Sequence, residues 1–179
     1  MSDKGQAACS VALLIIDVQR ALFERRTPIY RGAELLHNIN LLIEKAHQAG
    51  VAVIFVQHVN KSFLVEGSEG WQLHPLLTPA SSDLVMHKHH GSALHDTSLH
   101  QQLQSRGINT LVITGLVTQG CVKATCEAAK MQGYRVILVE DGHSSYHKDA
   151  ATLVDEWNRK LSEGGIELCT VETVDFSGL

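Results

Sequence analysis

The sequence has no apolar run approaching the ~18 residues that a membrane-spanning helix needs. Residues 1–10 are mostly polar and lack a basic segment followed by an apolar core, so we expect no secretory signal and a cytoplasmic protein. The 15 basic and 19 acidic residues are interspersed and leave a formal net charge of −4, with no basic stripe for nucleic acid. These absences predict a protein that binds neither nucleic acid nor a membrane.

Cysteine is scarce, and its four positions show no metal-binding spacing such as C-x-x-C. A cytoplasmic chain of this size does not depend on disulfides. Two of the four, Cys126 and Cys169, are explained most simply as small apolar core residues. Cys9 carries no signal, and Cys121 is considered below.

The chain has 179 residues, of which 44% are hydrophobic and 19% charged, and shows no repeat, linker or low-complexity segment. This composition predicts one domain, residues 1–179, with a substantial core. Apolar runs read as strands alternate with segments of helical spacing. We predict strands at 11–17, 51–56, 83–86, 109–114, 134–139 and 166–171, and helices at 32–49, 98–106, 118–131 and 148–161.

Several predicted strands are apolar throughout, which is typical of a parallel sheet covered on both faces. The predicted fold is therefore α/β, a three-layer α/β/α sandwich with a six-stranded, mainly parallel sheet. The long irregular stretch 57–82 contains Gly70, Trp71 and two prolines. A loop of this length inside a compact domain favours a role as a pocket wall or lid.

Cys121 follows a predicted buried strand, with Gly115 as the turn and Thr118 as the N-cap of the next helix. The thiol is then expected in the first helical turn, where free N–H groups and the helix dipole stabilise a thiolate. Taken alone, the segment is equally consistent with a small apolar residue at a helix start.

Two further titratable residues are expected at the same edge of the sheet, beyond the carboxyl ends of the strands. Asp17 ends the first strand and Lys88 follows the third. A nearby ammonium lowers the pKa of a thiol, and a carboxylate can accept its proton. Singly, the aspartate is also explained as a turn cap and the lysine as a solvated side chain; together with Cys121 they favour nucleophilic catalysis.

An ordered series of motifs resembles the isochorismatase-like cysteine hydrolases, a superfamily that includes nicotinamidases, carbamoyl-amine amidohydrolases and isochorismatases. The resemblance extends over residues 11–171. The matching residues are Ile15-Ile16-Asp17-Val18-Gln19, Gly70-Trp71-Gln72-Leu73-His74-Pro75, Lys88, Ser92-Ala93-Leu94, Thr97, Gly107-Ile108, Gly115-Leu116-Val117-Thr118-Gln119-Gly120-Cys121-Val122, Thr125, Gly133-Tyr134 and Asp141-Gly142-His143-Ser144-Ser145.

The resemblance implies Cys121 as nucleophile, Asp17 as general base and acid, and Lys88 as the cation that holds the thiolate. It also implies a cis Leu116–Val117 peptide and an oxyanion hole formed by the backbone N–H groups of Val117 and Cys121. The implied reaction is hydrolysis of an amide, carbamoyl or lactam C–N bond in a small molecule, through a thioester on the cysteine.

Loop position suggests four residues for the substrate pocket: Phe23, Trp71, Leu94 and Tyr146. Trp71 is equally well explained as a core residue or an oligomer contact. The resemblance further implies a homo-oligomer, a dimer or larger.

Nicotinamidases carry an Asp-x-His metal motif after the second strand, whereas this chain has Gln57 and His58 there. We therefore predict no metal and no cofactor, although His58 and His74 leave a metal site open as an alternative. Two other functions stay open: vinyl-ether hydrolysis of the isochorismatase type, and a non-catalytic binding or assembly role.

Overall fold

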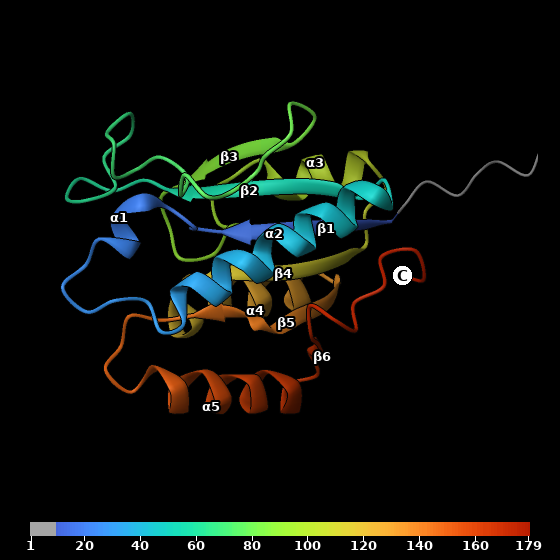
Figure 1. Ribbon diagram of the computed structural model, residues 1–179. Coiled ribbons are helices and arrows are strands. Elements are labelled where there is room, and N and C mark those ends of the chain that lie inside the picture. The colour runs from blue at the N-terminus through green and yellow to red at the C-terminus, as the bar shows by residue number, and fades with distance from the viewer. Residues whose placement is uncertain (1–9) are drawn as a thin grey trace, which may run out of the picture.

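The structure is a computed structural model that describes residues 10–179. Strands and helices alternate along the chain (Figure 1). In order they are β1 (Val11–Ile16), α1 (Arg20–Phe23), α2 (Gly32–Gln48), β2 (Ala52–His58), β3 (Leu84–Lys88), α3 (Leu99–Ser105), β4 (Thr110–Leu116), α4 (Lys123–Met131), β5 (Arg135–Ser144), α5 (Ala150–Glu163) and β6 (Glu167–Cys169).

The strands form one sheet in the order β3-β2-β1-β4-β5-β6, and every neighbouring pair is parallel. Strand β1 lies in the middle, where Leu14 pairs with Ile54 on one side and with Ile113 on the other. All six of its residues are buried. The predicted six-stranded parallel sheet is confirmed.

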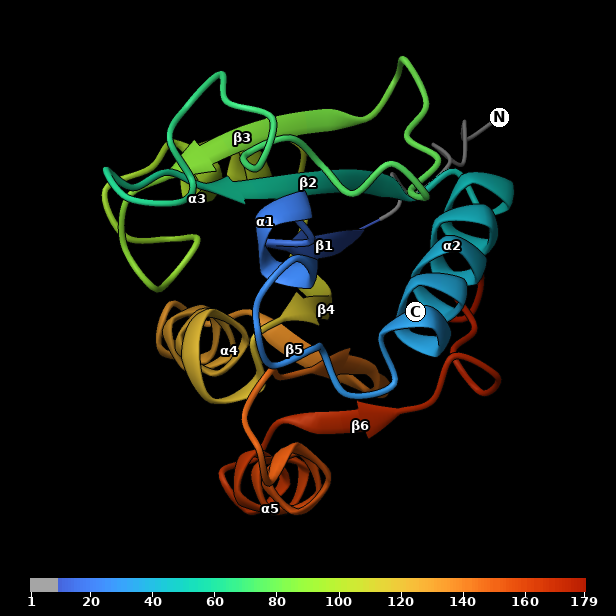
Figure 2. The ribbon, with the colours of Figure 1, turned by 60° about the vertical axis from the view of Figure 1, so that its left-hand side comes forward.

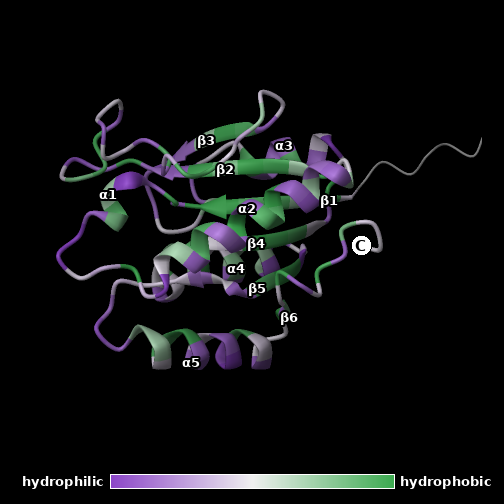
Figure 3. Ribbon diagram, viewed as in Figure 1, coloured by the Kyte–Doolittle hydropathy of each residue, from purple (hydrophilic) through white to green (hydrophobic). Residues whose placement is uncertain are grey.

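The sheet is covered on both faces, and the alternation of side chains along β1 sorts the core into two clusters. Leu13 and Ile15 pack in one cluster with the apolar face of α2 and with Phe176 near the C-terminus. Leu14 and Ile16 pack on the opposite face with residues of α3, α4 and α5. Figure 2 shows α2 on one side of the sheet and α3 and α4 on the other, and Figure 3 shows the apolar strands between helices of mixed polarity. The three-layer architecture is confirmed.

The strand ends differ from the prediction where they approach the site. Strand β4 continues through Gly115 to Leu116, so Gly115 is part of the strand rather than a turn. It has φ +122° and lies against β1, where an added Cβ would overlap the backbone of Ile16. Strand β5 extends to Ser144, and the short helix α1 was absent from the prediction.

The irregular segment between β2 and β3 lies beside α1. The N–H of Ala21 donates to the carbonyl of Gly70 at 2.9 Å, and Gln19 forms an isolated bridge with Leu73. This segment therefore packs at the carboxyl edge of the sheet, as expected for a pocket wall. Within residues 10–179, no helix has the length and apolar character needed to cross a membrane.

Candidate active site

The structure brings together the three titratable residues predicted at the sheet edge. Nζ of Lys88 lies 2.9 Å from Oδ2 of Asp17 and 3.2 Å from Sγ of Cys121. Lys88 is completely buried and Asp17 is only 2% exposed. Burying a charge is costly unless it is paired, and the ammonium and the carboxylate are buried as such a pair.

The parallel sheet sets this arrangement. Asp17 follows β1, and its N–H donates to the carbonyl of Val56 on β2 at 2.9 Å. Lys88 ends β3, where it pairs with His58 of β2. Asp17 has φ +51°, a left-handed conformation that is uncommon outside glycine, and its side chain reaches Lys88 at the end of β3.

Lys88 has two further partners. Its Nζ donates to Nδ1 of His58 at 2.9 Å and to the carbonyl of His90 at 3.0 Å. Burial, and then the neighbouring Lys88 ammonium, lower the pKa of His58 to about 4, so its ring is neutral and accepts the hydrogen bond. The sequence analysis considered His58 only as a metal ligand and did not predict its hydrogen bond with Lys88. The signal for it was that His58 and Lys88 end two neighbouring strands.

The residues present do not fit a metal site of the nicotinamidase type. Ligand atoms of Asp17, His58 and Cys121 lie within 4.8 Å of one another. However, Nζ of Lys88 lies within 3.2 Å of each residue, so its ammonium already supplies the central positive charge. Gln57 donates to the carbonyl of Trp71 at 2.9 Å instead of offering a carboxylate.

His74, the other histidine considered as a metal ligand, is directed elsewhere. Its Nδ1 accepts a hydrogen bond from the N–H of Leu76 at 3.3 Å, and its ring centroid lies 4.5 Å from that of Phe23. It belongs to neither group of potential metal ligands found within residues 10–179. The structure therefore does not bring His58 and His74 together as a ligand pair.

Cys121 lies in a wide turn, Thr118–Val122, between β4 and α4. The Leu116–Val117 peptide is cis, which confirms that prediction. The predicted cap is wrong: Val117 occupies the N-cap position, and Gly120 interrupts the turn with non-helical dihedral angles. The N–H groups of Val117 and Cys121 remain the predicted oxyanion hole.

The hydroxyl of Thr118 bonds to a buried histidine that sequence reasoning missed. It lies 2.8 Å from Nδ1 of His143, whose Nε2 lies 2.8 Å from Oδ1 of Asn158. Because Nδ2 of Asn158 donates to the carbonyl of Glu140, Oδ1 is the end that accepts from Nε2. Nδ1 is then the acceptor, and Thr118 donates. Burial lowers the pKa of His143 to about 4, consistent with this neutral ring.

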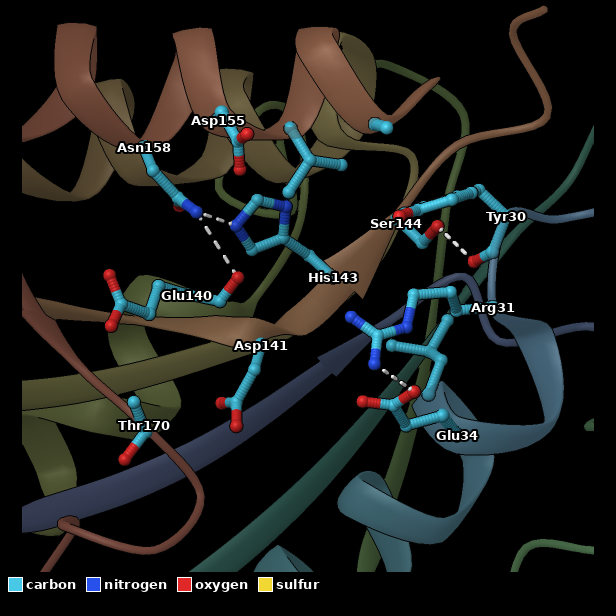
Figure 4. A pocket seen from close by; sticks show the side chains of 13 residues that line it. Tyr30, Arg31, Glu34, Glu140, Asp141, His143, Ser144, Asp155, Asn158 and Thr170 are labelled. Atoms are coloured by element: carbon cyan, nitrogen blue, oxygen red, sulfur yellow. Dashed lines mark hydrogen bonds and ion pairs between the residues drawn. The ribbon is translucent and has the colours of Figure 1, made fainter. Parts of the chain in front are cut away.

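His143 and Asn158 lie at the wall of a cavity of about 400 Å³ between α2, β5 and α5 (Figure 4). None of the three clustered residues, Asp17, Lys88 and Cys121, lines this cavity. The cavity is therefore distinct from the candidate active site, although the His143–Thr118 hydrogen bond connects its wall to the turn that carries the thiol.

The prediction of a lowered thiol pKa is wrong for this structure. Burial and the Asp17 carboxylate raise the pKa of Cys121 to about 12, which outweighs the opposing effect of Lys88. Burial also raises the pKa of Asp17, opposed by the Lys88 ammonium. Burial therefore favours the protonated thiol of Cys121. Oδ1 of Asp17 is buried and has no hydrogen-bond partner within residues 10–179.

The four predicted pocket residues lie in two groups. Phe23 and Tyr146 are partly buried against the core cluster on the α2 side, which Val117 also contacts. Leu94 is buried in the opposite cluster, against which Cys121 packs. Trp71 meets His87 edge to face, with ring centroids 4.8 Å apart. Their contact with substrate stays a prediction.

Comparisons with known proteins agree with this fold. A family model described as isochorismatase domain matches residues 11–170. A crystal structure of an isochorismatase family protein superposes with a TM-score of 0.85 at 28% identity, and the match covers 92% of this chain and 100% of that one.

Two curated relatives are hydrolases by name. Streptothricin hydrolase of Streptomyces noursei is 31% identical over 142 residues, which are 78% of this chain and 51% of that protein. Ureidoacrylate amidohydrolase of Methylobacterium radiotolerans is 34% identical over 101 residues, which are 54% of this chain and 39% of that protein. The match thus spans about half or less of each relative's length. Because the family model matches nearly all of the sequence, the chain belongs to the isochorismatase-domain family.

Proposed function

We propose that this protein is a cysteine hydrolase that cleaves a C–N bond of a small molecule, an amide, carbamoyl or lactam. The observation that carries the proposal is the buried Lys88 ammonium, 2.9 Å from the Asp17 carboxylate and 3.2 Å from the Cys121 sulfur. The name of the relative ureidoacrylate amidohydrolase supports the same class of bond, and the name of streptothricin hydrolase supports hydrolysis.

The first half of the reaction transfers the acyl group to sulfur. Asp17 accepts the thiol proton as Sγ of Cys121 attacks the substrate carbonyl carbon, and Lys88 stabilises the thiolate that burial disfavours. The negative charge on the carbonyl oxygen is stabilised by the N–H groups of Val117 and Cys121. As the C–N bond breaks, Asp17 returns the proton to the leaving nitrogen. An amine or ammonia then departs from an amide or carbamoyl substrate, whereas the freed amino group of a lactam stays on the acyl chain.

The second half hydrolyses the thioester. Asp17, again a carboxylate, takes a proton from a water molecule as the water oxygen attacks the acyl carbon. The C–S bond breaks, the carboxylic or carbamic acid leaves, and the proton returns to the sulfur. Phe23, Trp71, Leu94 and Tyr146 are proposed to enclose the substrate. The homo-oligomer stays a prediction, which light scattering of the purified protein tests.

The test begins with a screen of small amides and ureas for release of ammonia or amine, and of lactams for the new amino group of the opened ring. On the substrate found, Cys121→Ser should lose more than about 10³-fold in kcat, since Asp17 is too weak a base to activate a hydroxyl. Cys169→Ser serves as the control, because Cys169 ends β6 and packs against the core cluster on the α2 side, whereas Cys121 packs against the opposite cluster. Rapidly quenched Asp17→Asn protein should carry the acyl group on Cys121 by mass spectrometry if acylation persists.

A second candidate function is vinyl-ether hydrolysis, which the raised pKa of Asp17 favours because that chemistry needs an acid. It predicts the opposite result: Cys121→Ser turns over at nearly the wild-type rate, whereas Asp17→Ala is inactive. A non-catalytic binding role would leave the whole screen negative.

Chelation tests the mechanism without metal. Because the Lys88 ammonium lies among the ligand atoms of Asp17, His58 and Cys121, turnover should survive dialysis against EDTA. Loss of turnover that Zn²⁺ or Mn²⁺ restores would instead support a nicotinamidase-like metal enzyme.

A further inference from the structure

We propose that His90, His95 and Asp96 form a second site, one that binds a divalent transition-metal ion. Nε2 of His90 lies 3.4 Å from Oδ2 of Asp96, and Nε2 of His95 lies 3.7 Å from the same oxygen. One ligand atom from each of the three lies within 4.8 Å of the others. The three residues follow β3, outside the Asp17–Lys88–Cys121 cluster.

The separations fit metal coordination. Two ligands bound to Zn²⁺ at 2.0–2.1 Å in tetrahedral geometry are about 3.3–3.4 Å apart. The two N···O distances, 3.4 and 3.7 Å, are close to that value, and the stacked imidazole rings would rotate apart so that each Nε2 lone pair points at the ion. Two imidazoles and one carboxylate form a donor set suited to Zn²⁺, Co²⁺ or Ni²⁺ rather than to Mg²⁺ or Ca²⁺.

An ordinary surface ion pair does not account for this arrangement as well. The rings of His90 and His95 stack with centroids 4.0 Å apart, and both Nε2 atoms lie within 3.7 Å of a single carboxylate oxygen. Surface pairs contribute only ~0–1 kcal/mol, which gives little reason for two imidazoles to share one carboxylate. The three side chains are exposed, so an ion can enter and solvent can complete its coordination.

The loop between the ligands is held in place. Ala93 and Leu94 are buried. The N–H of Ala93 donates to Oγ1 of Thr125 on α4 at 3.1 Å, which fastens the loop to that helix. The hydroxyl of Thr97 donates to the carbonyl of Ala93 at 2.6 Å. The ligands are therefore presented by a fixed backbone, which lowers the entropic cost of binding an ion.

The site adjoins the candidate active site through the backbone. The carbonyl of His90 accepts a hydrogen bond from Nζ of Lys88 at 3.0 Å, so an ion on the His90 side chain would hold the segment that contacts the buried ammonium. The proposal of metal binding does not depend on the proposed hydrolase activity, because binding is measured without a substrate.

The experiment is calorimetric titration of the purified protein with Zn²⁺. We expect one ion per chain, and His95→Ala and His90→Ala should each weaken binding by at least about tenfold, the lower limit seen when even an outer-shell partner of a metal is removed. Asp96→Asn removes the charge but keeps a residue that tolerates the left-handed backbone at φ +51°, so weakened binding there is not due to misfolding.

Two controls locate the ion. His89→Ala removes an exposed neighbouring histidine outside the cluster and should bind Zn²⁺ as the wild type does. His58→Ala alters the other group of potential ligands and should also leave this binding intact. No binding by the wild type, equal binding by His95→Ala, or loss confined to His58→Ala would each overturn the proposal. Co²⁺ gives a second readout, because a site without cysteine should show no thiolate charge-transfer band.

Discussion

The hydroxyl of Thr118 lies 2.8 Å from Nδ1 of His143, although the two residues are 25 positions apart in the sequence. Thr118 is in the turn that carries Cys121, and His143 is near the end of β5. Both side chains are buried, and Asn158 of α5 completes the chain of hydrogen bonds. The turn that positions the thiol is thus anchored by hydrogen bonds to β5 and α5.

Thr118→Val tests this anchor. The variant keeps the shape of the side chain but leaves Nδ1 of His143 buried without a donor, which should lower the free energy of unfolding by about 1–3 kcal/mol. Urea unfolding measures this change. Thr118→Ser keeps the hydroxyl and should lose clearly less; equal losses for the two variants would mean that the hydrogen bond contributes little.

Asp17→Asn should make Cys121 more reactive toward alkylation. The Asp17 carboxylate is one cause of the raised thiol pKa, so removing its charge lowers that pKa while Lys88 remains. Below the pKa, each unit of lowering increases the thiolate fraction about tenfold. The rate of iodoacetamide labelling at pH 8, mapped to Cys121 by mass spectrometry, should therefore rise.

Lys88→Met is the matched opposite, because it removes the cation that lowers the thiol pKa, and it should slow labelling. If Asp17→Asn labels no faster than the wild type, the carboxylate does not control the thiol in the way the structure indicates.

Acid should destabilise the protein through His143. Its pKa is about 4 in the folded state, against about 6.5 when unfolded, so the unfolded state binds the proton more readily. The stabilisation is complete above pH 6.5 and is lost as the pH falls toward 4, by about 2–3 kcal/mol. His58, lowered for a similar reason, acts in the same direction.

The measurement is urea unfolding at several pH values between 7.5 and 4.5 for the wild type and for His143→Gln. The variant should show a shallower loss of stability over this range, because it lacks one titrating group. Parallel curves would contradict the assignment of His143 as a buried neutral ring.

Gly115→Ala should destabilise the fold severely. An added Cβ would overlap the backbone of Ile16 on β1, and a side chain is also strained at φ +122°. We expect a loss of at least about 3 kcal/mol or no soluble protein. Gly107→Ala is the control: its φ is +67°, but no atom of residues 10–179 lies within 4 Å of the added Cβ, so the cost should stay near the ~1–2 kcal/mol of a left-handed residue.

Local sequence pattern was sufficient for most of the fold and for the members of the active-site cluster. Apolar runs in β1, β2, β4 and β5 indicated buried parallel strands, and parallel strands bring their carboxyl ends to one edge. The sequence pattern alone therefore predicted that Asp17, Lys88 and Cys121 lie together. The metal ligands considered, His58 and His74, could not be placed correctly, because hydrogen-bond partners that are distant in the sequence decide which way each ring faces.

What the sequence by itself determined is the parallel sheet and the edge at which its reactive side chains meet, since both follow from periodicity and strand order. Only the tertiary structure decided the protonation of those side chains. Burial of Cys121 beside Asp17 raises the thiol pKa although Lys88 opposes this effect. The partnership of Thr118 with His143 was likewise beyond the sequence, because solvent exclusion and through-space contacts depend on how all the layers pack.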